Sequence, residues 1–443
     1  MEKIILEILK EEIKPATGCT EPVAVAYGAA LASEILAEEV KELKILVNAN
    51  LFKNGMGVFV PGTRKKGLHW AAVLGALLGD GKKELEVLEG LPENSEQLGE
   101  AFLNTHEVSV DYIEKKAEVF VQVSALGKEN HSRVVIEKSH DNVVLKEKNG
   151  KTLYLQGREN SIKYPRKFLQ EALRIPELIQ GVRALGAKDL EFLYPVIQKN
   201  REIGSHGQRR KLGMGVGYSL TALMKEKTLG EDVINKAKAL TAGASDARMS
   251  GASYTVYSCA GSGNQGLAAS LPVLVMAEEL GLGKERLLRG LALSFMVTIY
   301  VKNRIGRLSA LCGCGIAAGV GSAVALGDFM GMSPEKIEKG VQNIIGNLTG
   351  MICDGAKPGC ALKLSTSVGA VMEMMFLADK GTGFSEGEGI NGDTLQQSIE
   401  NLGALSTQGM ESADELILRL MVAQNPEIRG DNNGGKPSKA TIH

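Results

Sequence analysis

The sequence predicts a mainly helical α+β fold with a strand-rich insert near the N-terminus. Between residues 42 and 155, apolar and polar residues alternate with period two, which is typical of strands with one buried face. From residue 165 onward the segments are long and helical in pattern, and glycine clusters separate them. We therefore predict an N-terminal helical segment at 1–41, a strand-rich insert at 42–160 and a helical domain at 161–443.

The individual elements follow from local pattern. The first ten residues form an amphipathic helix that we expect to end near Pro15, and a second helix follows in the Ala-rich run from Val23 to Leu36, with Thr20 as its N-cap. The last predicted strand of the insert should be followed by a turn at Asn149-Gly150. Its predicted strands lie at 44–48, 117–123, 133–137 and 143–146.

The N-terminus has no apolar core followed by a small-residue cleavage site, so we interpret it as a helix and not as an export signal. The apolar stretch from Ala310 to Gly327 approaches the length of about 20 residues that spans a bilayer. It consists mostly of Gly, Ala and Ser, and we interpret it as a tightly packed buried helix. A cytoplasmic location is therefore expected, where thiols stay reduced and cysteines serve as metal ligands or reactive groups.

Composition and charge narrow the class of partner. The chain of 443 residues is 44% hydrophobic and 23% charged, as in an ordinary soluble globular protein. Its 51 basic and 52 acidic residues are spread along the chain, so neither nucleic acid nor an anionic membrane is expected as the main partner. A small-molecule substrate is expected instead. The oligomeric state, including a homo-oligomer, stays open.

Four of the six cysteines lie in Gly-rich turns of the C-terminal half: Cys312, Cys314, Cys353 and Cys360. Thiolates bind iron–sulfur clusters, and backbone N–H groups of glycine-rich turns can donate hydrogen bonds to the cluster sulfurs. The spacing matches neither common ferredoxin pattern. Two alternatives stay open at this point: a zinc site that uses the close pair Cys312 and Cys314, and buried cysteines with a packing role.

Cys19 stands apart from this group, in a short loop that opens an apolar helix. A thiol at a helix N-terminus has its thiolate stabilised by the helix dipole and by free N–H groups. The position therefore predicts a base or nucleophile. A buried cysteine with no chemical role is the alternative.

Six ordered motifs resemble the L-cysteine desulfidase family, also called iron–sulfur cysteine desulfhydrases. The resemblance extends from about residue 8 to 420, and its members are more remotely similar to the α-chain domain of iron–sulfur L-serine dehydratases. The motifs are GCTEP at 18–22, KNGMGV at 53–58 with VPGT at 60–63, SDARM at 245–249, GSGNQG at 261–266, LSALC at 308–312 and GMICDGAK at 350–357.

The resemblance implies a helical catalytic body of the serine dehydratase α type. It also implies a [4Fe–4S] enzyme that converts L-cysteine and water to hydrogen sulfide, ammonia and pyruvate without pyridoxal phosphate. The family's cluster ligands fall on Cys312, Cys353 and Cys360, and its catalytic base falls on Cys19. Cys314 stays a substitute for Cys312, and we interpret Cys259, which matches no required position, as a packing residue.

The substrate's carboxylate needs hydrogen-bond donors. The segment 261–266 offers backbone N–H groups and the polar side chains of Ser262, Asn264 and Gln265, in the form of an anion nest. Asn54 and Arg248 are further candidates. L-serine dehydration on the same scaffold is the nearest alternative; a pyridoxal-phosphate lyase would need a Schiff-base lysine, and a cysteine-rich metal or redox sensor would leave Cys19 without a function.

Overall fold

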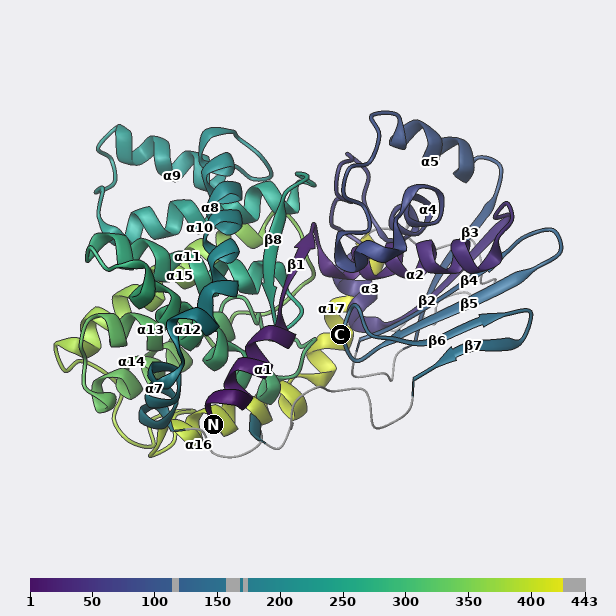
Figure 1. The fold of residues 1–443 in the computed structure, drawn as a ribbon. Coiled ribbons are helices and arrows are strands. Elements are labelled where there is room, and N and C mark those ends of the chain that lie inside the picture. Colours follow the sequence, from purple (N-terminus) through teal and green to yellow (C-terminus); the bar gives the residue numbers. More distant parts are fainter. Residues whose placement is uncertain (114–118, 157–167, 170–173, 425–443) are drawn as a thin grey trace, which may run out of the picture.

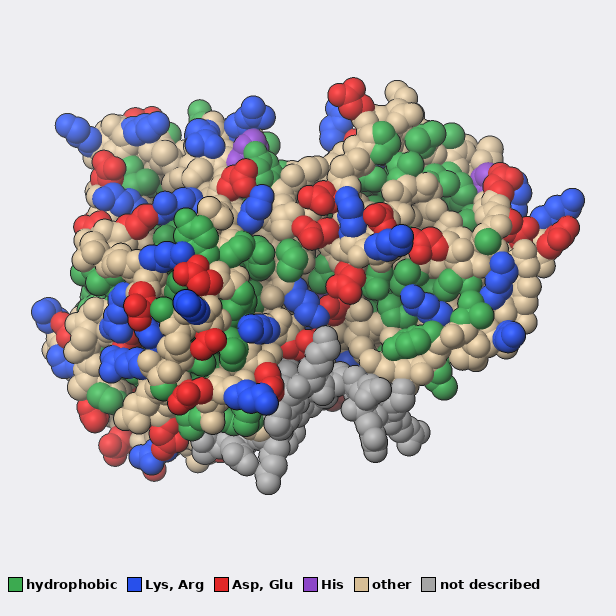
Figure 2. All heavy atoms as spheres, in the orientation of Figure 1, with side chains coloured by type: hydrophobic (Ala, Val, Ile, Leu, Met, Phe, Trp, Pro, Cys, Tyr) green, Lys and Arg blue, Asp and Glu red, His purple; other side chains and the backbone are tan. Residues whose placement is uncertain are grey.

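The computed structural model describes residues 1–113, 119–156, 168–169 and 174–424. Figure 1 shows two lobes side by side, a helical lobe and a smaller lobe in which helices cover a twisted sheet. This arrangement confirms the predicted mainly helical α+β fold with strands in the N-terminal part. On the face in Figure 2, a notch separates the upper parts of the two lobes, and side chains of both charges are interspersed on each lobe.

The smaller lobe is built on a six-stranded sheet with the strand order β3-β2-β4-β5-β6-β7. β2 and β3 are parallel and the other pairs are antiparallel. Helix α2 packs on β4 and β5, and α4 packs on α2. The elements are α2 (Thr20–Leu36), β2 (Glu42–Asn48), α3 (Ala49–Gly55), α4 (Leu68–Leu78), η1 (Gly81–Glu86), α5 (Ser95–Leu103), β3 (Glu107–Ile113), β4 (Phe120–Leu126), β5 (His131–Glu137), β6 (Val143–Lys148) and β7 (Lys151–Leu155).

Most predicted strands are confirmed. The strands at 44–48, 133–137 and 143–146 lie within β2, β5 and β6. Asn149 and Gly150 both have positive φ, 49° and 75°, as a two-residue turn of type I′ requires, and they join β6 to β7. β4 contains the end of the strand predicted at 117–123, whereas Ala117 lies outside the described residues. The parallel strand β3 was not predicted.

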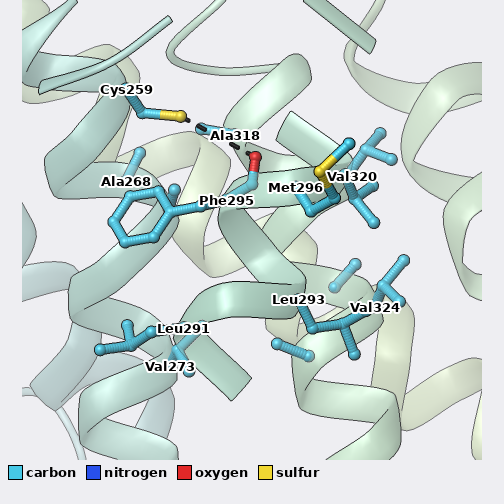
Figure 3. Close-up of a cluster of buried hydrophobic side chains, with 14 of the residues drawn as sticks. Cys259, Ala268, Val273, Leu291, Leu293, Phe295, Met296, Ala318, Val320 and Val324 are labelled. Carbon is cyan, nitrogen blue, oxygen red and sulfur yellow. Dashed lines mark hydrogen bonds between the residues drawn. The ribbon is translucent and has the colours of Figure 1, made fainter. Parts of the chain in front are cut away.

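The helical lobe buries three helices at its centre, α11 (Gly263–Glu279), α12 (Lys284–Ile305) and α13 (Ala317–Phe329). Figure 3 shows apolar side chains of these helices packed together, with the Cys259 thiol directed at the Phe295 carbonyl. The other elements are α1 (Glu2–Glu12), α7 (Ile175–Ala184), η3 (Ala187–Leu193), α8 (Tyr194–Arg209), α9 (Val216–Lys225), α10 (Val233–Met249), α14 (Pro334–Leu348), α15 (Cys360–Asp379), α16 (Leu395–Ala404), η4 (Leu405–Gly409) and α17 (Glu411–Gln424).

The predicted buried helix in the apolar stretch 310–327 is confirmed as α13, although the helix begins only at Ala317. All residues of α13 are buried, and the helix packs on α11, α12 and α14. Among the described residues, one helix, α15, is long and apolar enough to cross a membrane by length and composition. In the structure α15 packs on α10 and α14 of the helical lobe.

A two-stranded ribbon runs between the lobes (Figure 1). It pairs β1 (Ile13–Thr17) antiparallel with β8 (Thr255–Cys259). Beyond β1 the chain turns at Gly18, where φ is +81° and an added Cβ would lie 2.0 Å from a Pro61 carbon, so glycine is needed there. This turn starts α2, so that residues 1–13 belong to the core of the helical lobe and α2 to that of the other lobe. The predicted domain boundary at 160/161 lies outside the described residues.

Candidate active site

Two chain segments of the helical lobe bring Cys312 and Cys353 together. Leu311 and Ile352 form an isolated antiparallel bridge, in which Cys312 N–H donates to the Met351 carbonyl at 2.9 Å and Cys353 N–H donates to the Ala310 carbonyl at 2.6 Å. Cys312 and Cys353 are therefore diagonal neighbours on one face of the bridge, a relation that separates residues by about 7–8 Å. Positions 41 apart in the sequence thus present their thiols on the same side.

The other two thiols lie beside this pair. Cys314 lies beside Cys312, and the interaction between the two thiols lowers the pKa of Cys312 to about 6 and raises the pKa of Cys314 well above its usual value. Cys360 is the first residue of α15, and its thiol faces the Gly355 carbonyl at 3.8 Å. Burial raises the pKa of Cys360 to about 11, and the charges of Cys312 and Cys353 add to this effect. The four thiols are thus within electrostatic range of one another.

Lysines surround these thiols. Lys302 of α12 is buried, and burial lowers its pKa although Cys314, Cys353 and Cys312 act in the opposite direction. Lys363, on the second turn of α15, also acts on Cys312 and Cys360. Lys53 is buried too, pairs with Asp414 and acts on Cys353. Buried cations beside thiols stabilise thiolates, yet of the four thiols only Cys312 has a lowered pKa, whereas the pKa values of Cys314, Cys353 and Cys360 are raised.

This donor set fits an iron–sulfur group in its chemistry. Thiolates are the ligands such groups use, and the neighbouring lysines offset the negative charge that several thiolates carry. Among the described residues, no three His, Cys, Asp or Glu side chains are grouped as ligands for a single metal ion. In a [4Fe–4S] cluster each thiolate binds a different iron atom. The ligands of a cluster therefore surround the whole cluster, whereas the ligands of a single metal ion converge on one atom.

Cys19 lies on the opposite wall, at the start of α2. It is the N-cap of this helix, and Thr20, predicted as the N-cap, is the first helical residue. The Cys19 thiol donates to Glu21 Oε2 at 3.0 Å. Burial, followed by the charge of Glu21, raises the pKa of Cys19 well above its usual value. The expectation that the helix N-terminus lowers this pKa is therefore wrong, because desolvation and an adjacent carboxylate outweigh the dipole.

A short series of contacts joins Cys19 to the thiols of the other wall. The second oxygen of Glu21, Oε1, accepts from Asn54 Nδ2 at 3.0 Å, and Asn54 Oδ1 faces the Cys353 thiol at 3.9 Å. Cys19 also shares a small apolar cluster with Val58 and Met249, against which Cys360 packs. The predicted base is therefore joined to Cys353 through Glu21 and Asn54, and to Cys360 through this apolar cluster.

Arg248 and Asn264 form the third part of the site. Arg248 is 2% exposed, and its Nη1 donates to Asn264 Oδ1 at 3.1 Å. Its Nε and Nη2 have no hydrogen-bond partner within the described part of the chain. The guanidinium lies against Gly263, where an added Cβ would be 2.5 Å from Nε, so only glycine allows this close approach. A buried guanidinium with a free edge is suited to binding a carboxylate.

Most of segment 261–266 is not a loop, because α11 begins at Gly263. Ser262 is the N-cap, and its hydroxyl accepts from Gln265 N–H at 3.4 Å and meets the Cys314 sulfur at 3.7 Å. The Gln265 amide donates to the Cys259 carbonyl at 3.0 Å, whereas its Oε1 has no partner among the described residues. The polar side chains expected to bind substrate thus lie between Arg248 and the cysteines.

A hollow of about 960 Å³ adjoins the loop between Cys353 and Cys360. Gly57 and His69 line it from the smaller lobe, and Asp354, Ala356 and Lys357 line it from the cysteine loop. It therefore gives small molecules a way to reach the loop that carries two of the predicted ligands.

Three buried residues of the site were not predicted from the sequence: Glu21, His140 and Lys302. Glu21 is part of the GCTEP motif, and its position in the first turn of a helix was the available signal. His140 follows β5, and Gly261 approaches its ring so closely that an added Cβ would lie 3.1 Å from Nδ1. Burial lowers the pKa of His140. The sequence does not indicate that Lys302 is buried, because a lysine inside a helical pattern usually faces solvent.

Comparison with known proteins assigns the class. Residues 82–419 match the family model described as the serine dehydratase alpha chain. The chain belongs to this family, which confirms the remote similarity predicted from the motifs. The match covers Arg248, the 261–266 segment and all four site cysteines of the helical lobe, whereas Cys19, Glu21 and Asn54 precede it.

Within this class, the relatives that match nearly the whole chain are UPF0597 proteins. The relative from Clostridioides difficile (strain 630) is 41% identical, and the alignment covers 95% of this chain and 99% of the relative. The relative from Alkaliphilus oremlandii (strain OhILAs) is 39% identical, and the alignment covers 96% of this chain and 99% of the relative. The relative from Caldanaerobacter subterraneus subsp. tengcongensis is 39% identical, and the alignment covers 95% of this chain and 98% of the relative.

Proposed function

We propose that this protein is an L-cysteine desulfidase, a carbon–sulfur lyase that eliminates hydrogen sulfide from L-cysteine and releases ammonia and pyruvate. The observation that supports the proposal is the series of contacts Cys19–Glu21–Asn54–Cys353, which joins the candidate base to the thiols that we propose as cofactor ligands. The motif resemblance supports L-cysteine as the substrate. We place the reaction in the cytoplasm, where the thiols stay reduced.

In this proposal Cys312, Cys353 and Cys360 hold a [4Fe–4S] cluster, and Cys314 is available as a substitute for Cys312. When bound, the cluster supplies a Lewis-acidic iron without a protein ligand, which makes the sulfur of the substrate a better leaving group. The buried ammonium groups of Lys302 and Lys53 compensate negative charge at this wall.

The chain's own side chains orient the substrate and move its proton. The free edge of Arg248 binds the substrate's carboxylate, and Asn264 holds the guanidinium in place through its hydrogen bond. Cys19 removes the α-proton. It acts in this step as its thiolate, and in the resting site its thiol donates a hydrogen bond to the Glu21 carboxylate at 3.0 Å. Cleavage of the carbon–sulfur bond then leaves aminoacrylate, which tautomerises and hydrolyses to pyruvate and ammonia.

L-serine dehydration is the second candidate, because the matching family model is described as the serine dehydratase alpha chain. The same side chains would orient L-serine, and hydroxide would leave in place of hydrosulfide. The two candidates differ in the atom that leaves, not in the proton that Cys19 removes.

The decisive experiment is anaerobic purification with quantitation of iron and sulfide, followed by assays on L-cysteine and L-serine side by side. We expect visible absorption from bound cluster and a higher kcat/KM on L-cysteine. A protein that binds no iron, or that releases pyruvate from L-serine alone, would contradict the proposal.

The Cys19→Ala variant tests the base within the same assay. We expect it to keep its iron and to bind L-cysteine, but to lose sulfide release and exchange of the α-proton with solvent by about 10²–10⁴-fold, the usual contribution of a general base. A Cys19→Ala protein that exchanges the α-proton at the wild-type rate would show that another residue is the base.

A further inference from the structure

Glu21 is a buried carboxylate whose environment differs from that of a structural ion pair. Its side chain is 7% exposed, and no ion pair of it is formed among the described residues. Its partners are instead the Cys19 thiol at 3.0 Å and the Asn54 amide at 3.0 Å, together with the Thr20 hydroxyl at 3.1 Å, which shares its one hydrogen with the Gly261 carbonyl at 2.9 Å. A carboxylate is costly to bury, and hydrogen bonds from three uncharged donors serve stability less well than an apolar residue would.

The surroundings of this carboxylate nevertheless favour its ionised form. Although burial disfavours the charge, the field of His140 when its ring is protonated, the hydrogen bond from Cys19 and the field of Arg248 lower the pKa of Glu21 below its usual value. The position in the first turn of α2 adds the favourable helix dipole. Several elements from both lobes thus support one negative charge at this point.

We propose that Glu21 is a positioning residue, whose two carboxylate oxygens hold Cys19 and Asn54 in fixed directions toward the substrate. The inference rests on the proposed function, because it assigns to Cys19 the removal of a substrate proton. Oε2 accepts from the thiol, and Oε1 accepts from Nδ2 of Asn54, which fixes the Asn54 carbonyl toward Cys353. One carboxylate therefore sets the distance between Cys19 and the wall of the site that carries Cys353.

This role needs a side chain that is long enough to contact both Cys19 and Asn54 and that carries two acceptor oxygens. Glutamine has the reach but only one acceptor, so it cannot accept from both the Cys19 thiol and Asn54 Nδ2. Aspartate has two acceptors and the charge but is one methylene shorter. Both substitutions therefore break the bridge, whereas an electrostatic role alone would tolerate aspartate.

The experiment compares Glu21→Gln and Glu21→Asp with Asp328→Asn as the matched control. Asp328 is also a buried carboxylate, 6% exposed, but it pairs with Arg183 and Arg286 of the helical lobe. In cluster-containing protein we expect both Glu21 variants to keep their iron and their KM for L-cysteine. Their kcat and α-proton exchange should fall by about 10- to 100-fold, as for a displaced catalytic group. The control should stay near wild type.

Several results would overturn the positioning role while leaving the proposed function in place. These are an unchanged kcat in both Glu21 variants, a raised KM with unchanged kcat, and loss of iron, which would show a purely structural carboxylate. A Glu21→Asp variant with wild-type kcat would likewise overturn it, because charge without reach would then suffice.

A readout without turnover separates the two proposals. In folded metal-free protein, the rate at which iodoacetamide alkylates Cys19 is measured by mass spectrometry of the Cys19 peptide. We expect a severalfold faster rate in Glu21→Gln than in wild type and no change in Asp328→Asn, because the thiol is released from its carboxylate partner. Equal rates in wild type and Glu21→Gln overturn the positioning role even if the protein proves to act on neither L-cysteine nor L-serine.

Discussion

The two walls of the site are built differently. On the N-terminal wall, Cys19, Glu21 and Asn54 are at most 9% exposed and bonded to one another at about 3 Å. On the other wall, Cys312 is buried, but Cys314, Cys353 and Cys360 are partly exposed, lie on Gly-rich segments and make contacts of 3.7–3.9 Å. Proton transfer needs a fixed geometry, whereas thiols that receive a metal group need room to turn toward it.

The origin of the walls differs in the same way. The N-terminal wall is carried mainly by α2 and α3 of the smaller lobe and lies before the residues that match the family model. The cysteine wall belongs to the helical lobe and lies within that match. The comparison suggests two separable tasks, metal binding on one wall and proton handling on the other, and each prediction below tests one side of it.

The largest effect is expected on the cysteine wall. Cys353→Ser removes a predicted ligand, so the purified protein should lose the brown absorption and sulfide release, and its Tm should fall because cluster binding no longer stabilises the folded state. Iron analysis, visible spectra and thermal unfolding measure this.

Cys259→Ala is the matched control for this change. Cys259 is fully buried in the helical core and packs near Phe295 (Figure 3). We expect this variant to lose about 1 kcal/mol of unfolding free energy and to keep its iron. If Cys353→Ser retains full iron content, Cys353 is not a ligand.

A smaller effect is expected where the two walls meet the substrate. Arg248→Lys keeps the charge but loses the planar fork, so binding of the substrate's carboxylate should weaken by about 1.5–3 kcal/mol, seen as a KM for L-cysteine raised roughly 10- to 100-fold. Steady-state kinetics measure this, with Arg286→Lys, on the far side of the helical lobe, as the control. An unchanged KM would remove Arg248 from the substrate site.

The smallest effect concerns stability on the N-terminal wall. Burial lowers the pKa of His140, and Arg307 adds to this effect while Glu21 and Asp141 oppose it. Below a pH of about 6.5 the unfolded chain binds a proton at His140 that the folded protein does not. The contribution of the neutral ring to the free energy of unfolding is therefore full above that pH and is lost as the pH falls, by at most about 1.4 kcal/mol per pH unit.

His140→Gln should therefore lose Tm less steeply than wild type between pH 7 and pH 5. Thermal unfolding at several pH values measures the difference, and the exposed residue His131, changed to Gln, provides the control. Parallel pH profiles for wild type and His140→Gln would show that the ring is not neutral in the folded protein.

The sequence predicted what depends on local pattern and motif. Helices α2 and α13, strands β2, β5 and β6, and the cysteines with Arg248 and Asn264 could be found because periodicity and motif residues mark them. The parallel strand β3 could not, because its pairing depends on a distant partner. The pKa of Cys19 was predicted in the wrong direction because the helix N-terminus was visible in the sequence, whereas the burial of the thiol and the orientation of Glu21 depend on packing between lobes.

The ribbon of β1 and β8 has a consequence for the order of assembly. Its last pair joins Thr17 to Thr255, positions 238 apart, and the Thr20 hydroxyl then bonds the Gly261 carbonyl across a separation of 241. Contacts between such distant positions close a long loop of chain and therefore form late in folding. The lobes can each collapse around their own core first, and the two walls face each other only once this ribbon has formed. If the cysteine wall holds the proposed cofactor, that group could therefore bind before the two walls of the site face each other.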